Sequence, residues 1–223
     1  MTQRLSGVSN EEAGGLAAEI IEASDLFLGR TSNLVRILAA HSPFVARWFL
    51  GLVAAVRQPN LGASSDVRLR NLATIKTSMV NECTYCATHT SIFGEALGLK
   101  LDDLEALRGD TYKTSPLFNE REKAAIEWAE AMTLNTAKKS GKVWDDMRRL
   151  FTDTEIVEIS MAAAMFNMIN RLNDSFWTEL EPDKYNRRQA DAVTGRSVEQ
   201  IEDYAGRFGK TGKAERESMK AMA

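Results

Sequence analysis

Apolar residues recur every three or four positions along most of this chain, which is the spacing of one face of an α-helix. The clearest stripe lies between about residues 153 and 176 and consists of Ile156, Ile159, Ala163, Phe166 and Ile169. No segment alternates convincingly between apolar and polar residues, as a half-buried strand would. The pattern therefore predicts an all-α protein.

Capping and turn residues divide the pattern into separate helices. Ser9 and Glu12 have the spacing of a capping box, as do Asn119 and Glu122, and Thr152 and Glu155. Expected helices cover about residues 10–28, 32–40, 44–56, 67–80, 83–97, 102–107, 119–134 and 153–176, with one more between Gly141 and Thr152.

The sequence turns polar after Trp177. We therefore expect residues 1–180 to form a single all-helical domain, with N-terminal helices over 10–58 and a core over 64–177. Residues 181–223 are expected to form a polar C-terminal arm with one short helix near 198–205.

The chemistry of the chain is concentrated in Cys83-Thr-Tyr-Cys86 and the nearby His89. The chain contains two cysteines and two histidines, so this stretch holds both thiols and one of the imidazoles. Two thiols at this spacing can close a disulfide, and a neighbouring imidazole or a helix N-terminus favours a thiolate. The alternative is that the cysteines are small core residues and the histidine is a capping group.

Glu82 extends this set if the whole motif is helical. Glu82 and Cys86 are then at i, i+4, while Cys86 and His89 are at i, i+3, so one face holds a carboxylate, two sulfurs and an imidazole. Such a set is suited to thiol–peroxide or thiol–disulfide chemistry.

Zinc and haem are competing uses of these residues. Cys83, Cys86 and His89 offer three zinc ligands and His41 a fourth, but structural zinc sites usually draw on two separated pairs. Covalent haem attachment needs a histidine directly after the second cysteine, where this chain has Ala87. We therefore expect no metal and no cofactor apart from a redox-active Cys83–Cys86 disulfide.

Net charge and hydropathy limit the classes of partner that the protein can bind and the cellular compartment in which we expect it. A formal net charge of −3 and a pI near 5.6 argue against nucleic acid. No apolar run reaches the roughly 18 residues that a membrane span needs. The first residues lack the apolar segment of a secretory signal, so we expect a cytoplasmic protein. In that compartment a CxxC is more often catalytic or metal-binding than structural.

Residues 69–71 and 80–89 together resemble the alkyl hydroperoxidase D / carboxymuconolactone decarboxylase superfamily. Residues 33–43 and 164–172 are similar to helices that precede and end the core in its peroxidase-related members. The resemblance covers about residues 30–177 and implies an alkylhydroperoxidase D-like helical bundle that assembles as a trimer or hexamer.

The same resemblance implies an antioxidant enzyme that reduces small peroxides through a CxxC dithiol/disulfide cycle. Cys86 would be the peroxidatic thiol and Cys83 the resolving thiol, and a dithiol reductant protein or small thiol would regenerate the pair. Decarboxylase members lack the cysteine pair, so that activity is disfavoured.

Two positions depart from the family pattern. Asn71 stands where the family has its relay glutamate, and Thr90 stands where it has its relay histidine. His89 lies one residue before the position of the family's relay histidine. On an α-helix, a shift of one residue rotates the direction of a side chain by about 100°. Glu82 and His89 are the expected substitutes, with peroxidase activity weaker or tuned to another substrate.

Two further hypotheses remain open. One is a thiol–disulfide oxidoreductase or redox sensor without direct peroxide turnover. The other is a non-catalytic helical assembly protein.

Self-assembly is the first testable expectation. Phe44, Trp48, Phe49 and Val53 offer more apolar surface than a small core needs, so we expect them to be partly buried between subunits, with the arm after Trp177. Light scattering should give the mass of a homo-oligomer. A single-chain mass across micromolar concentrations would contradict this.

Overall fold

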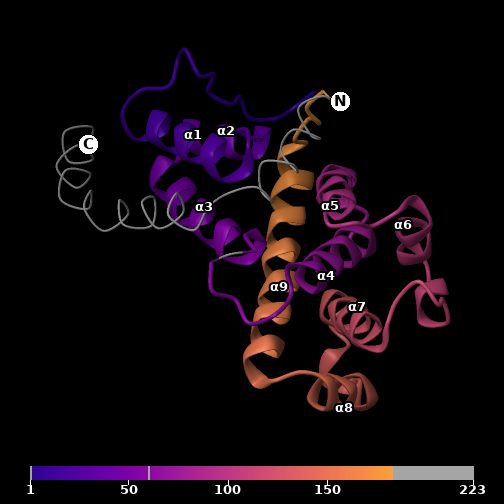
Figure 1. Ribbon diagram of the computed structural model, residues 1–223. Helices are drawn as coiled ribbons and strands as arrows, with labels where there is room; N and C mark the ends of the chain where they lie inside the picture. Colours follow the sequence, from indigo (N-terminus) through magenta and orange to yellow (C-terminus); the bar gives the residue numbers. More distant parts are fainter. Residues whose placement is uncertain (1, 60, 183–223) are drawn as a thin grey trace.

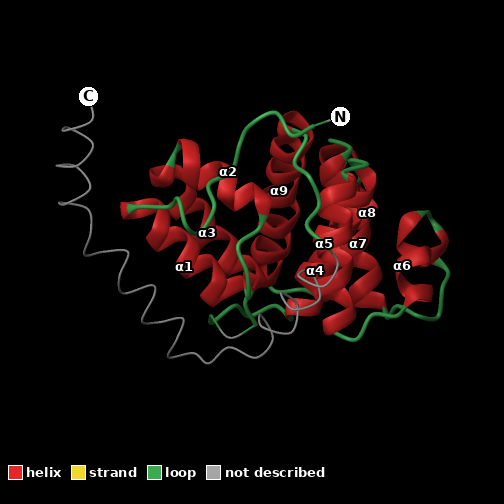
Figure 2. Cartoon of the chain, turned by 90° about the horizontal axis from the view of Figure 1, so that it is seen from above, coloured by secondary structure: helices red, strands yellow, loops and turns green. Residues whose placement is uncertain are grey.

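The computed structural model describes residues 2–59 and 61–182, and all regular secondary structure in that part of the chain is helical (Figures 1 and 2). The predicted all-α class is thus confirmed there. The α-helices are α1 (Gly15–Leu28), α2 (Asn33–His41), α3 (Pro43–Arg57), α4 (Val67–Val80), α5 (Thr84–Ala96), α6 (Leu101–Arg108), α7 (Glu120–Thr133), α8 (Gly141–Leu150) and α9 (Asp153–Phe176), with 3₁₀ turns at Thr111–Lys113 and Ala137–Lys139.

Helix α9 runs through the middle of the structure, with α1, α2 and α3 on one side and α4 to α8 on the other (Figure 1). It packs against α3, α4, α5, α7 and α8. One apolar cluster joins the N-terminal helices to α5 and α9, and it includes Leu50, Phe93, Phe166 and both cysteines. The cysteine motif therefore lies where the N-terminal helices meet the core.

Local capping explains most of the helix starts. Ser32 accepts a hydrogen bond from the Val35 amide, and reciprocal capping boxes form between Asn119 and Glu122 and between Thr152 and Glu155. Each such cap contributes about 1 kcal/mol. These interactions span only three residues, which is why the sequence alone predicts them.

The predicted start of the first helix at residue 10 is wrong. Ser9 and Glu12 do form both capping-box hydrogen bonds, each 3.2 Å long, but they close only one isolated turn. Gly14 is extended and Gly15 has a φ of +54°, so α1 begins at Gly15. Two adjacent glycines lose much backbone entropy in a helix, so the turn does not continue.

The expected intersubunit surface is partly wrong. Phe49 and Val53 are buried in the chain's own core, at 9% and 6% exposure. Phe44 and Trp48 are 49% and 60% exposed, and their burial between subunits stays a prediction. The arm beyond residue 182 lies outside the described residues. None of the helices described here is long and apolar enough to cross a membrane.

Helices α4 and α5 approach closely at Gly94. A Cβ on Gly94 would lie 2.6 Å from Leu99 Cδ1, 3.0 Å from Asn71 Nδ2 and 3.1 Å from Ile75 Cδ1. Asn71 and Ile75 lie on α4 and Leu99 follows α5, so an added methyl group would have to displace side-chain ends on both sides.

We predict that Gly94→Ala destabilises the fold although alanine favours helices. Overpacking at a tight contact typically costs about 1–3 kcal/mol, more than the gain in helix propensity of about 1 kcal/mol. The matched control is Gly141→Ala, because nothing lies within 4 Å of a Cβ there. Urea denaturation should give a lower midpoint for Gly94→Ala alone; equal midpoints would refute the close-approach argument.

Candidate active site

The turn between α4 and α5 positions the two cysteines. Glu82 has a φ of +57°, and its amide donates to the Met79 carbonyl at 3.1 Å. The Cys83 amide donates to the Ser78 carbonyl, also at 3.1 Å, which completes a Schellman motif at the end of α4. Helix α5 then starts at Thr84, so Cys83 is its N-cap and Cys86 lies in its first turn.

This turn corrects the expected role of Glu82 in a shared helical face. Glu82 lies before α5 and its side chain is exposed, so it does not form an i, i+4 helical pair with Cys86. Its left-handed backbone conformation, uncommon for a residue other than glycine, ends α4 and redirects the chain. The predicted placement of the cysteines at the start of a helix is confirmed.

The two thiols are buried and unequal. Cys83 is 0% exposed and Cys86 is 1% exposed, and neither is in a disulfide. A hydrogen bond from the Cys83 thiol lowers the pKa of Cys86; burial opposes this effect, and hydrogen bonds from Asn170 and Asn173 add to it. The same thiol–thiol hydrogen bond, followed by burial, raises the pKa of Cys83. Cys86 is therefore the sulfur that ionises first.

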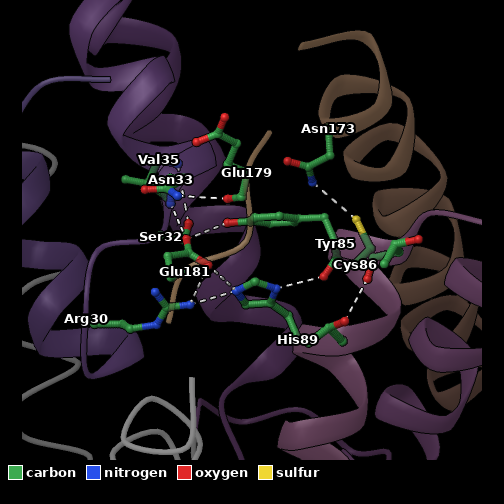
Figure 3. A network of polar contacts seen from close by, with 12 residues as sticks. Arg30, Ser32, Asn33, Val35, Tyr85, Cys86, His89, Asn173, Glu179 and Glu181 are labelled. Carbon is green, nitrogen blue, oxygen red and sulfur yellow. Dashed lines mark hydrogen bonds and ion pairs between the residues drawn. The ribbon is translucent and has the colours of Figure 1, made fainter. Parts of the chain in front are cut away.

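Asparagines on α9 hold the cysteine turn. Asn173 Nδ2 donates to Cys86 Sγ at 3.2 Å (Figure 3). Asn81, in the turn, donates to Asn167 Oδ1 at 3.0 Å and to Asn170 Oδ1 at 2.8 Å. The sequence resemblance stopped at residue 172, so Asn173 was missed; its spacing of three from Asn170 on one helix was the available signal.

A carboxylate next to Asn173 was missed as well. Asp174, which is exposed, contributes to the raised pKa of Cys83. Asp174 therefore favours the protonated form of the Cys83 thiol.

His89 shares α5 with Cys86, but its ring nitrogens bind other groups (Figure 3). Nδ1 lies 2.7 Å from the Tyr85 carbonyl oxygen, which only accepts, so Nδ1 carries the hydrogen. Nε2 lies 2.7 Å from Arg30 Nη2 and 2.9 Å from Glu181 Oε2. The imidazole is thus held in a buried polar network and does not offer a nitrogen to the Cys86 sulfur.

Glu181 is the centre of that network. Its carboxylate accepts from the Tyr85 hydroxyl at 2.7 Å, from Arg30 at 3.0 Å and from the Asn33 backbone amide. Burial disfavours the charged form, but hydrogen bonds and charges from His89 and Arg30 outweigh it and lower the pKa of Glu181. Glu181 therefore ties the segment after α9 to α5 and to the start of α2.

The two departures from the family pattern contact each other. Asn71 Nδ2 donates to the Thr90 carbonyl at 3.3 Å, and the Thr90 hydroxyl donates to the Cys86 carbonyl at 2.8 Å. Both side chains are buried. Neither position supplies a titratable group near the thiols, and both instead brace the first turns of α5.

The ligands considered for zinc are not assembled. His41 is exposed at the end of α2, with Nε2 2.9 Å from the Ser6 carbonyl oxygen. Across residues 2–59 and 61–182, no group of three or more histidine, cysteine, aspartate and glutamate side chains is arranged to hold a metal ion.

Solved structures show which fold this is. A cysteine-to-alanine variant of the debrominase Bmp8, in complex with 2,3,4-tribromopyrrole, superposes with a TM-score of 0.68 at 20% identity, over 86% of this chain and 98% of that one. A peroxidase-related protein of Ralstonia eutropha JMP134, described as an alkylhydroperoxidase AhpD core, gives 0.67 at 17% identity over 83% and 96%. The fold is that of the alkylhydroperoxidase-like proteins.

A third structure agrees with this result. A peroxidase-related protein of Silicibacter sp. TM1040 gives a TM-score of 0.64 at 20% identity, over 83% of this chain and 97% of that one. No protein-family model and no curated protein matches the sequence significantly. The alkylhydroperoxidase-like fold expected from the cysteine motif is thus confirmed by structure.

The Glu181 network predicts a pH-dependent contribution to stability. Because the pKa of Glu181 is lowered on folding, its stabilisation is present above the ordinary value of 4.5 and is lost as the pH falls below it. Glu181→Gln should lower the free energy of unfolding by about 3 kcal/mol near pH 7, and by progressively less below pH 4.5.

Glu179→Gln is the control, because Glu179 is exposed two residues earlier. Chemical denaturation at a series of pH values measures both effects. A Glu181→Gln deficit that stays constant into acid would show that the ion pair does not cause it.

Proposed function

We propose that this protein is an alkylhydroperoxidase-like antioxidant enzyme that reduces small peroxides through a Cys83–Cys86 dithiol/disulfide cycle. The observation that carries the proposal is the unequal pair of buried thiols at a helix N-terminus. Partial positive charge at that terminus adds to the hydrogen bonds that favour the Cys86 thiolate. The alkylhydroperoxidase-like fold also supports the proposal of a peroxidase.

The first step is attack by the Cys86 thiolate on the terminal oxygen of a hydroperoxide. A sulfur–oxygen bond forms, the oxygen–oxygen bond breaks, and the leaving oxygen departs as an alkoxide that takes a proton from water. Cys86 is oxidised to a sulfenic acid, and the peroxide is reduced by two electrons to an alcohol.

Cys83 resolves the sulfenic acid. Its sulfur displaces the hydroxyl group of oxidised Cys86 as water and forms the disulfide. The Cys83 thiol must lose its proton in this step, and we assign the carboxylate of Asp174, which raises the pKa of that thiol, as the group that receives the proton and passes it to the departing hydroxyl group. Thiol–disulfide exchange with a dithiol, either a reductant protein or a small molecule, then returns both cysteines and leaves the reductant oxidised.

A second candidate is reductive debromination, because the fold matches that of Bmp8 over almost the whole of that chain. A thiolate that takes oxygen from a peroxide can also take bromine from an electron-rich ring. A sulfur–bromine bond forms, the ring carbanion takes a proton, and Cys83 displaces bromide to give the same disulfide. Both candidate reactions consume one dithiol for each turnover. They differ in the substrate that oxidises Cys86, which is a peroxide in one case and a brominated ring in the other.

Peroxide turnover tests the proposal. With dithiothreitol as the dithiol, the protein should consume hydrogen peroxide or tert-butyl hydroperoxide, and Cys86→Ser should abolish the activity. The tryptic peptide 77–100 contains both cysteines, so oxidation should lower its mass by two hydrogens. Thiols that both remain alkylatable after peroxide treatment would exclude the peroxidase. Disulfide formation with tribromopyrrole but not with peroxide would favour the second candidate.

A further inference from the structure

Arg57 is a half-buried cation with no hydrogen bond or ion pair to the described residues. It is the last residue of α3, and its Nε atom is buried and makes no hydrogen bond. No carboxylate in the described residues forms an ion pair with it. Buried charges are ordinarily paired, since an unpaired one costs several kcal/mol. Such a group needs an explanation.

The position of Arg57 relates it to the thiols. Its guanidinium lies over the ring of Phe93 at 4.4 Å and near that of Phe166 at 5.8 Å. Phe93 is on α5, which carries Cys86, and Phe166 is on α9, which carries Asn173. The two rings belong to the same apolar cluster as both cysteines, and Arg57 is close enough for the charge of Cys86 to affect the Arg57 pKa.

The charge of Arg57 persists and acts on Cys86. Burial lowers the pKa of the Arg57 guanidinium to about 10, while the negative charge of the Cys86 thiolate acts in the opposite direction. The group is therefore still cationic near pH 7. The crevice that borders Arg57, with Asn71 and Phe93 also in its lining, is too narrow to hold a water molecule, so a ligand enters there only when side chains move.

Asn173 carries the complementary unpaired atom. Its Nδ2 donates to Cys86 Sγ at 3.2 Å and to the Ile169 carbonyl at 3.1 Å. Its Oδ1 is buried and has no hydrogen-bond partner. The great majority of buried polar atoms are paired, so an unpaired acceptor beside a nucleophilic sulfur marks a place for a donor.

We propose that Arg57 and Asn173 bind the substrate peroxide at Cys86, which deepens the peroxidase function proposed above and rests on it. A hydroperoxide has one O–H donor and two acceptor oxygens. Asn173 Oδ1 accepts the O–H of the terminal oxygen and holds that oxygen against the sulfur. The Arg57 guanidinium donates to the second oxygen.

These contacts match the charge movement of the reaction. As the Cys86 thiolate attacks the terminal oxygen, the oxygen–oxygen bond breaks and negative charge grows on the second oxygen. A cationic donor already facing that oxygen stabilises the transition state more than the bound substrate, which is the requirement for catalysis. Arg57 thereby supplies electrostatic stabilisation at a site where the relay positions Asn71 and Thr90 carry no charge.

The test compares two reactions of the same thiolate. Stopped-flow measurement of Cys86 oxidation by tert-butyl hydroperoxide reports peroxide binding and attack. Alkylation by iodoacetamide, a neutral electrophile without a leaving oxygen, reports the reactivity of the thiolate alone. Both are followed to the pH at which the alkylation rate reaches its plateau, so that each variant is compared with Cys86 fully ionised.

Arg57→Met should slow peroxide oxidation by about 10²-fold, the effect of losing one oxyanion donor, and leave plateau alkylation unchanged. Asn173→Ala should also slow peroxide oxidation more than alkylation, and in addition move the alkylation midpoint to higher pH. Arg108→Met is the matched control, because Arg108 is exposed at the end of α6, and it should change neither rate.

Arg57→Lys keeps the charge and takes the place of the methionine variant if the latter does not fold. It should recover part of the peroxide rate but not all of it, because a lysine cannot reproduce the planar donor set. Equal losses toward peroxide and iodoacetamide, or no loss toward peroxide, would overturn the assignment of Arg57. Failure of the unmodified protein to react with peroxide would instead refute the peroxidase function itself.

Discussion

The interaction between the Cys83 and Cys86 thiols is the one on which the proposed chemistry of this protein depends. It lowers the pKa of Cys86 and raises that of Cys83, so two identical side chains differ in acidity. The Schellman turn at Glu82 sets this geometry by making Cys83 the N-cap of α5 and leaving Cys86 inside the first turn. On α9, Asn173 donates a hydrogen bond to the Cys86 sulfur, and Asn170 and Asn173 both lower the pKa of Cys86.

Burial of the two thiols increases the effect of these hydrogen bonds and charges on their pKa values. Both cysteines are almost inaccessible to water, where hydrogen bonds and charges act at a lower effective dielectric. The same burial penalises the thiolate, so the site functions only if enough donors surround the sulfur. Arg57 fits this requirement, because it brings positive charge into the apolar cluster without a carboxylate among the described residues to neutralise it.

The sequence predicts the parts of the structure that local interactions decide. Helix periodicity and caps such as Asn119 and Thr152 act within four residues, and the helices from α2 to α9 appear where they were expected. The placement of the CxxC at a helix start follows from the same rules. The Ser9 capping box shows their limit, because a glycine pair just beyond it stops the helix that it would begin.

The candidate site was only partly predictable, because most of it depends on contacts between distant residues. His89 looked available to Cys86 on a helical wheel, yet its partners Arg30 and Glu181 are 59 residues before it and 92 residues after it. Glu181 lies in a polar stretch, which the sequence pattern predicts to be a solvent-exposed arm. Asn173 had only its spacing of three from Asn170 as a sequence signal, and Arg57 had none, since only the packing of α3 against α5 and α9 relates it to the thiols.

The central claim is that Cys86 reacts with the oxidant and Cys83 resolves the product. Trapping with dimedone, which labels sulfenic acids, tests it most directly in Cys83→Ser and Cys86→Ser proteins exposed to one equivalent of peroxide. Mass spectrometry should show the dimedone adduct on Cys86 when Cys83 is replaced, and none on Cys83 when Cys86 is replaced. An adduct on Cys83 in the Cys86→Ser protein, forming as fast as the adduct on Cys86, would contradict the account.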